Sequence, residues 1–126
     1  EKFYFLVSEL NKNIHGTEYA SSTVSLADGY SFISDRFKGR DIGGRVIVYA
    51  NIQISSGNIP TGFQDIFTLP YGIQPSMPVF GCAYLDNGSG NTSSLAPLLI
   101  NSNGTVQINV ASETMRRIGI LLSYDK

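Results

Sequence analysis

The fold is decided by two stretches of the sequence, FTLPYGIQPS at residues 67–76 and LLINSNGTVQINV at residues 98–110. The first stretch predicts a strand that ends in a turn fixed by two prolines and a glycine. The second predicts two short strands joined by a tight Asn-Gly turn. Neither stretch contains a catalytic pattern. The sequence therefore predicts a compact β domain.

Further strands are indicated by apolar or alternating runs along the rest of the chain. These runs are residues 2–8, 23–26, 30–34, 45–54, 63–69, 78–85, 95–100 and 117–123. Asp28-Gly29 predicts a hairpin turn between 23–26 and 30–34. Polar loops or solvated turns are predicted at 9–17, 36–44, 86–94 and 111–116. Strands at short intervals, joined by turn signals, favour an all-β, compact antiparallel barrel or sandwich.

Composition narrows the possible partners. The chain has 126 residues, of which 42% are hydrophobic, and this suits a single core. Charged residues make up 15%, below the roughly 25% of an average soluble domain. A net charge of −1 argues against nucleic acid, because nucleic-acid modules carry clustered Lys and Arg. No run approaches the ~18 apolar residues of a membrane span, so no membrane insertion is expected.

Catalytic and metal-binding patterns are weak. The one histidine, His15, lies in a polar loop, and the one cysteine, Cys82, lies in an apolar run where a buried thiol is expected. The sequence has neither the spacing of metal ligands nor a phosphate loop, so no cofactor is expected. As an alternative, Asp86, Asn87 and Asn91 could together bind a calcium ion. The scattered acids do not indicate the facing pair of a glycosidase. The sequence therefore favours a protein that is not an enzyme.

Two segments combine the side chains that recognise sugars, whose rings have flat apolar faces and polar rims. The segment 84–91 is the better candidate and offers Tyr84, Asp86, Asn87 and Asn91. The second candidate, for an anionic sugar, consists of Arg36, Lys38 and Arg40. The alternative for segment 84–91 is a hairpin connection that binds no ligand. The alternative for Arg36, Lys38 and Arg40 is a solvated charged turn.

The order of these signals resembles the C-terminal receptor-binding head domains of tailed-phage tail fibres and baseplate tip proteins, including those of siphophages that infect Gram-positive cocci such as lactococci. The resemblance is carried by GRVIV at 44–48, LPYGIQPS at 69–76 and NGTV at 103–106, and it covers roughly residues 20–126. Residues 1–19 fall outside it and are expected to be a neck or shoulder remnant or a first strand. The matching residues are structural, with turns at Pro70, Gly72, Pro75 and Gly104 and core positions at Leu69, Val79, Ile100 and Val106.

The resemblance implies a small β-barrel head that forms a homotrimer at the tail tip or baseplate of a virion, in the extracellular space. Such heads bind a host cell-wall saccharide or phosphosaccharide without catalysis and contact other phage tail or baseplate proteins. No receptor-contact residue can be carried over from the family. A trimer also has a physical reason, because a β domain of low charge must cover its sheet edges and apolar faces. The alternatives are a structural tail or baseplate module that contacts phage proteins alone, and a glycan-cleaving or esterase domain.

Overall fold

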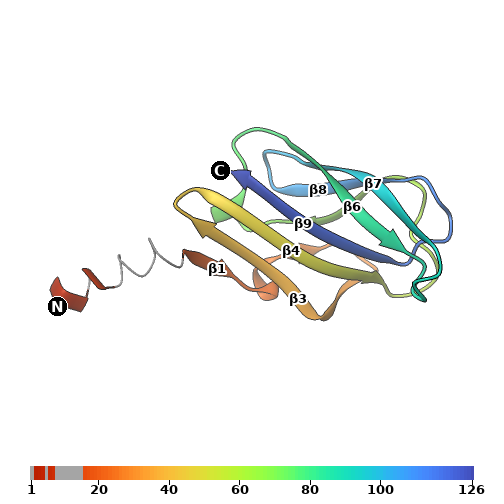
Figure 1. Ribbon diagram of the computed structural model, residues 1–126, viewed down its shortest axis with the longest axis horizontal. Coiled ribbons are helices and arrows are strands. Elements are labelled where there is room, and N and C mark those ends of the chain that lie inside the picture. The colour runs from red at the N-terminus through yellow and green to blue at the C-terminus, as the bar shows by residue number, and fades with distance from the viewer. Residues whose placement is uncertain (1, 5, 8–15) are drawn as a thin grey trace.

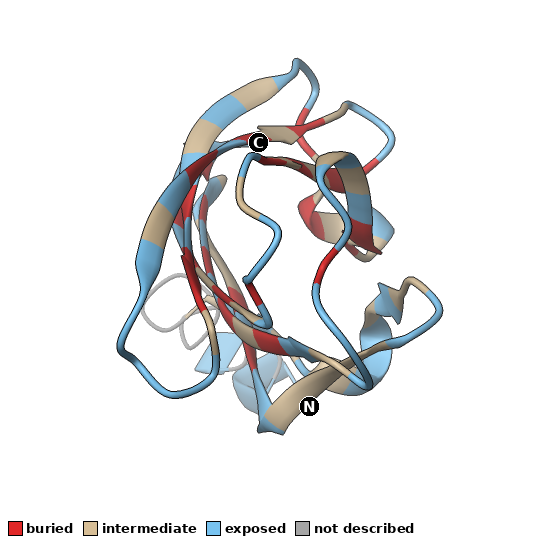
Figure 2. Ribbon diagram, turned by 90° about the vertical axis from the view of Figure 1, so that its right-hand side faces the viewer, coloured by how far each residue is buried: buried red, intermediate tan, exposed pale blue. Residues whose placement is uncertain are grey.

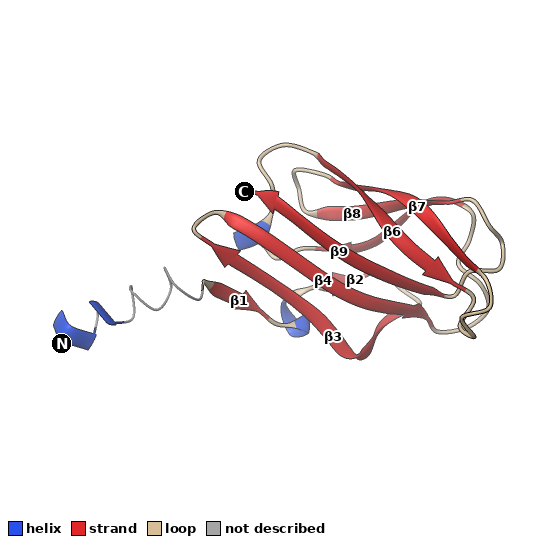
Figure 3. Ribbon diagram, in the orientation of Figure 1, coloured by secondary structure: helices blue, strands red, loops and turns tan. Residues whose placement is uncertain are grey.

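The computed structural model describes residues 2–4, 6–7 and 16–126. The described residues form a nine-stranded sheet that curls into a half-barrel around one core (Figure 1). This confirms the predicted all-β class. The strands are β1 (Thr17–Tyr19), β2 (Ser25–Leu26), β3 (Tyr30–Ile42), β4 (Arg45–Ile54), β5 (Gly62–Thr68), β6 (Val79–Asp86), β7 (Ser93–Ile100), β8 (Thr105–Val110) and β9 (Arg117–Asp125). Two short 3-10 helices, η1 (Ser21–Thr23) and η2 (Tyr71–Ile73), lie between strands (Figure 3).

The strand order across the sheet is β1-β3-β4-β9-β6-β7-β8-β5-β2. All the neighbouring pairs are antiparallel. β1 and β2 are consecutive in the chain and yet form the two opposite edges of the sheet. The segment through η1 therefore links the two edges. None of the helices in the described part of the chain is long and apolar enough to cross a membrane.

The core follows from the alternation of side chains along each strand. In β4, for example, Val46, Val48, Ala50 and Ile52 are fully buried, and most of the residues between them are exposed. Successive side chains of a strand point to opposite faces, so one face of the sheet lines the core and the other faces outward (Figure 2). Three of the four residues predicted as core on the family pattern are buried, and the fourth packs partly buried against the core: Leu69, Ile100, Val106 and Val79.

The two stretches that predict the fold contact each other. The Leu69 backbone N–H donates a hydrogen bond to the Gly104 carbonyl oxygen at 2.9 Å. The Gln74 side-chain amide in turn donates to the Leu69 carbonyl oxygen at 3.0 Å. Within the Asn-Gly turn, the Thr105 N–H donates to Asn103 Oδ1 at 3.0 Å. The proline turn and the β7–β8 hairpin therefore stabilise each other.

Two predictions for the first half of the chain are wrong. The turn at Asp28-Gly29 forms, but its flanking strands do not pair: β2 pairs with β5, and β3 pairs with β4. Residues 36–42, predicted as a solvated turn, continue β3, because Phe37 and Gly39 face inward while the charged residues that alternate with them face outward. Charge is compatible with a strand when one face is solvated.

The expectations for Cys82 and for residues 2–8 also require correction. Cys82 is exposed, because the alternation of β6 turns Ala83 and Leu85 into the core and Cys82 outward. Residues 2–4 and 6–7 are helical, and their apolar side chains are exposed. A strand needs a partner for its backbone groups, whereas a helical turn satisfies them locally. His15 and most of the loop predicted at 9–17 lie outside the described residues.

Gly104→Ala should destabilise the fold more than Gly29→Ala. Both glycines are in the left-handed region, with φ of 86° and 87°, so each substitution costs about 1–2 kcal/mol of backbone strain. A Cβ on Gly29 meets open space, whereas a Cβ on Gly104 would lie 2.7 Å from Gln74 Cγ. The displaced Gln74 would lose its hydrogen bond to Leu69, which adds about 1 kcal/mol. Urea unfolding of both variants measures the difference, and equal losses would contradict the coupling of the two turns.

Candidate functional site

A hollow on the outward face of the sheet brings together side chains from four strands. Its volume is about 220 Å³, smaller than the roughly 300–1,000 Å³ of a site for a drug-sized ligand. We call it the outer pocket. Its side chains are Ile33 and Arg36 from β3, Asn51 from β4, Tyr84 and Asp86 from β6, and Arg117 from β9, with Ile118 and Gly119 beside them. Three predicted ligand residues, Arg36, Tyr84 and Asp86, therefore meet in one place.

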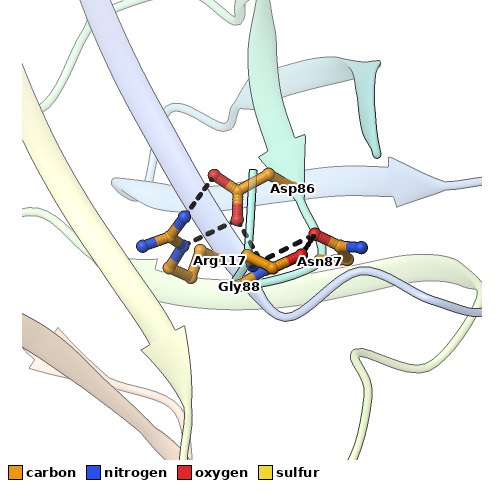
Figure 4. Close-up of polar contacts among 5 residues, drawn as sticks. Asp86, Asn87, Gly88 and Arg117 are labelled. Atoms are coloured by element: carbon orange, nitrogen blue, oxygen red, sulfur yellow. Dashed lines mark hydrogen bonds and ion pairs between the residues drawn. The ribbon is translucent and has the colours of Figure 1, made fainter. Parts of the chain in front are cut away.

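A bidentate ion pair holds one wall of the outer pocket. Arg117 Nε donates to Asp86 Oδ1 at 2.6 Å, and Arg117 Nη2 donates to Asp86 Oδ2 at 3.0 Å (Figure 4). Asp86 Oδ1 also accepts the Gly88 N–H at 2.8 Å, and the Asp86 backbone carbonyl accepts the Arg116 N–H at 2.7 Å. One nearly buried carboxylate thus ties β6, β9 and the β6–β7 loop together.

The bonds from Arg117 lower the pKa of Asp86 below its ordinary value of 3.8, and the Gly88 N–H acts in the same direction against the effect of burial. The same carboxylate raises the pKa of the Arg117 guanidinium. Both groups are therefore charged at neutral pH. The pair fixes the guanidinium plane at the pocket wall while leaving the rest of its donors available.

A wide bulge in β3 carries Arg36 to the pocket. Phe32 pairs with Ile52 and Phe37 with Ala50, so the four residues 33–36 lie opposite Asn51 alone. Ser34 and Asp35, inside this bulge, have φ of 53° and 54°, a left-handed conformation that is uncommon for residues other than glycine. Bulges redirect side chains and are frequent beside binding sites. Here the bulge supplies both Ile33 and Arg36 to the pocket.

Gly119 of β9 lies beneath the pocket. It is paired with Tyr84 on one side and with Asn51 on the other. A Cβ at this position would lie 3.7 Å from both Asn51 Oδ1 and Tyr84 Cδ1. Any larger side chain would project into the space between these two residues. The hollow therefore exists because the strand carries a glycine at this point.

A second hollow adjoins the outer pocket on the same face and contains the other two predicted cations. Its volume is about 310 Å³, and we call it the β1 hollow. Arg40 pairs with Glu18 at its edge, while Lys38 makes no ion pair with any described residue. The lining residues are Glu18, Tyr19, Lys38, Gly39, Arg40, Ile47 and Tyr49.

The remaining predicted ligands lie in the β6–β7 loop and line neither hollow. Asn87 Oδ1 accepts hydrogen bonds from the Ser89 N–H and hydroxyl at 3.1 and 2.9 Å, so this side chain stabilises the loop itself. Asn91 is exposed. For the calcium alternative, Arg117 occupies both oxygens of Asp86, and the described residues contain no cluster of three acidic, His or Cys ligands.

The outer pocket can bind a ligand with an apolar ring face and polar or anionic substituents. Tyr84 is 45% exposed, and its ring offers a surface for stacking. Arg36 and Arg117 offer planar donors that match hydroxyl, carboxylate or phosphate oxygens. Asp86 is the one carboxylate among the described residues that line the pocket. Its two oxygens are engaged by Arg117, so it is poorly placed to act as a free acid or base.

Sequence reasoning missed Asn51, Arg117 and Gly119. Gly119 carried a usable signal, because a glycine inside an otherwise apolar strand often marks the close approach of a ligand or backbone. Asn51 also interrupts the apolar run of β4 at an outward position. Arg117 carried no signal of its own, since its role depends on the register that sets it beside Asp86.

The fold is similar to that of a phage head domain, as the sequence resemblance implied. Among solved structures, the chain is similar to the crystal structure of the head domain of phage bIL170, a receptor-binding domain of a lactococcal phage. The TM-score is 0.61 at 18% sequence identity, over 81% of this chain and 93% of that chain. No protein-family model and no curated protein matches the sequence.

Acid should weaken the contribution of the Asp86–Arg117 pair to stability. Because the pKa of Asp86 is lower in the folded state than in the unfolded state, its stabilisation is complete above the unfolded pKa and is lost as pH falls through the folded pKa. We expect wild type to be more stable than Asp86→Asn by a constant amount from about pH 5 to 8, with the difference shrinking below about pH 4. Urea unfolding across this range measures it. A difference that persists unchanged to about pH 2 would contradict the ion pair.

Proposed function

We propose that this domain is the receptor-binding head of a phage tail protein, which attaches the virion to a bacterial cell-surface saccharide or phosphosaccharide without catalysis. The observation that carries the proposal is the outer pocket, where Tyr84, Arg36 and Arg117 meet on a fold of the phage head class. An aromatic ring with two guanidiniums is suited to a sugar that bears an anionic group. The absence of a free carboxylate pair among the described pocket residues favours binding over hydrolysis.

The proposed head acts as a homotrimer in the virion tail, at its tip or baseplate. An apolar patch made of Phe80, Cys82, Leu95 and Leu121 supports this, because all four side chains are exposed on the outward face of β6, β7 and β9. Exposed apolar patches of this kind mark protein interfaces. The patch lies beside the outer pocket, since Tyr84 pairs with Leu95 across β6 and β7. Three modest sites on one rigid tip would gain avidity on a repetitive glycan.

Tyr84→Ala should reduce binding of the labelled domain to susceptible Gram-positive cells about fivefold or more, because stacking on an aromatic ring contributes roughly 1–3 kcal/mol. Tyr71→Ala is the matched control, since Tyr71 is 90% exposed and lies outside the outer pocket. Gly119→Val should abolish binding because the valine side chain fills the space of the ligand, whereas Tyr84→Ala removes the stacking surface. Flow cytometry with and without competing wall polysaccharide measures these effects.

Equal binding by wild type, Tyr84→Ala and Gly119→Val would exclude the outer pocket as the receptor site. No binding by the well-folded wild type to cells that the parent virion infects would instead favour the structural alternative, a module that contacts other phage proteins. Release of fragments from purified wall polysaccharide would contradict the proposal of binding without catalysis.

The wild-type domain should have three times the monomer mass in solution, and Leu121→Asp should reduce it to the monomer mass. A charge placed in an apolar interface loses solvation without a partner. Phe63→Asp, on β5, is a close control because Phe63 and Leu121 are both 71% exposed. Light scattering with size-exclusion chromatography measures the mass. A monomeric wild type, or dissociation by Phe63→Asp alone, would contradict the proposed interface.

A further inference from the structure

The strand β3 carries a row of cations along the outward face of the sheet. Arg36, Lys38 and Arg40 are two residues apart, and the residues between them, Phe37 and Gly39, are buried. A strand advances about 3.4 Å per residue, so neighbouring cations stand about 7 Å apart and the row extends about 14 Å. Arg36 lines the outer pocket, and Lys38 and Arg40 line the β1 hollow. The row thus crosses both hollows.

The two hollows adjoin each other on β4. Tyr49 lines the β1 hollow and Asn51 lines the outer pocket. The Asn51 side-chain amide donates a hydrogen bond to the Tyr49 hydroxyl at 2.9 Å, which fixes the two side chains relative to each other. Lys38 pairs with Tyr49 across β3 and β4. We call the combined surface of the two hollows, with Glu18 at one end and Asp86 at the other, the outer groove.

The outer groove carries a net positive charge in a chain whose net charge is −1. Two carboxylates line it, and each already has a cationic partner: Glu18 with Arg40, and Asp86 with Arg117. Within the described residues, Arg36 and Lys38 make no ion pair. An aromatic ring is exposed in each hollow, Tyr49 at 38% and Tyr84 at 45%. The groove therefore repeats one combination, a ring surface beside an unpaired cation.

We propose that the outer groove binds several consecutive units of a linear glycan with repeated anionic groups, rather than one terminal sugar. This inference rests on the proposed adhesin function and specifies its ligand. β9 lies between β4 and β6, so Tyr49 and Tyr84 stand two strand spacings apart, about 10 Å, and one sugar ring can stack on only one of them. An extended chain can place one unit on each ring, with its anionic groups near Arg36 and Lys38. Asn51 connects the two stacking positions, because it lines the outer pocket with Tyr84 and donates a hydrogen bond to the Tyr49 hydroxyl.

The length of the glycan fragment distinguishes an extended binding mode from recognition of one terminal sugar. Wall polysaccharide from a strain that the domain binds is partly hydrolysed, separated by size, and titrated into the domain by isothermal calorimetry. Affinity should rise at least tenfold from the shortest fragments to those that span both hollows, and then level off. Higher salt should weaken the long fragments more, because they engage more charges.

Lys38→Ala tests the contribution of the β1 hollow. It should lower affinity for long fragments at least fivefold and leave the shortest fragments unchanged, while Lys38→Arg should retain the wild-type values. Lys2→Ala, which removes the same charge outside the sheet, is the control. Affinity that does not depend on length, together with unchanged binding by Lys38→Ala, would overturn the extended mode while the adhesin function stands. Failure of the wild type to bind either the polysaccharide or the cells would overturn both.

Discussion

The bidentate ion pair between Asp86 and Arg117 is the interaction on which the site depends. It joins the end of β6 to the start of β9, and the same carboxylate accepts the Gly88 N–H and so fixes the start of the β6–β7 loop. If either partner were removed, the other would keep an unpaired charge at the pocket wall, and the wall behind Tyr84 would lose its fixed geometry. The pair therefore links the stability of the sheet to the shape of the outer pocket.

Two backbone features complete the pocket around this pair. The bulge at 33–36 places four residues opposite Asn51 and carries Arg36 to the outward face, at the cost of two left-handed residues, Ser34 and Asp35. Gly119 leaves open the space that a side chain would fill. Beyond the pocket, the regular alternation of β3 and β4 sets Lys38, Arg40 and Tyr49 on the same outward face. A half-barrel with an ordinary apolar core thus carries a polar, positively charged groove on its outer surface.

Local signals in the sequence were sufficient for the fold class but not for the pairing of strands. The Asn-Gly and proline turns and the strand at 45–54 were predicted because their signals are local. The prediction of a hairpin at Asp28-Gly29 was wrong because β2 pairs with β5, which is distant in the sequence. Tyr84, Asp86 and Arg36 were selected by chemistry, but their meeting in one pocket depends on register across four strands. Arg117 could not be found without that register, whereas Gly119 could have been.

The receptor site can be located directly from the amide chemical-shift changes in the isotope-labelled domain when wall polysaccharide from a bound strain is added. We expect changes at Arg36, Asn51, Tyr84 and Gly119, which extend along β3 to Lys38 as longer fragments are used. We expect no change in the proline turn around Tyr71. Changes confined to that turn, or to the β6–β7 loop with none at Gly119, would contradict the assignment of the receptor site to the outer face of the sheet.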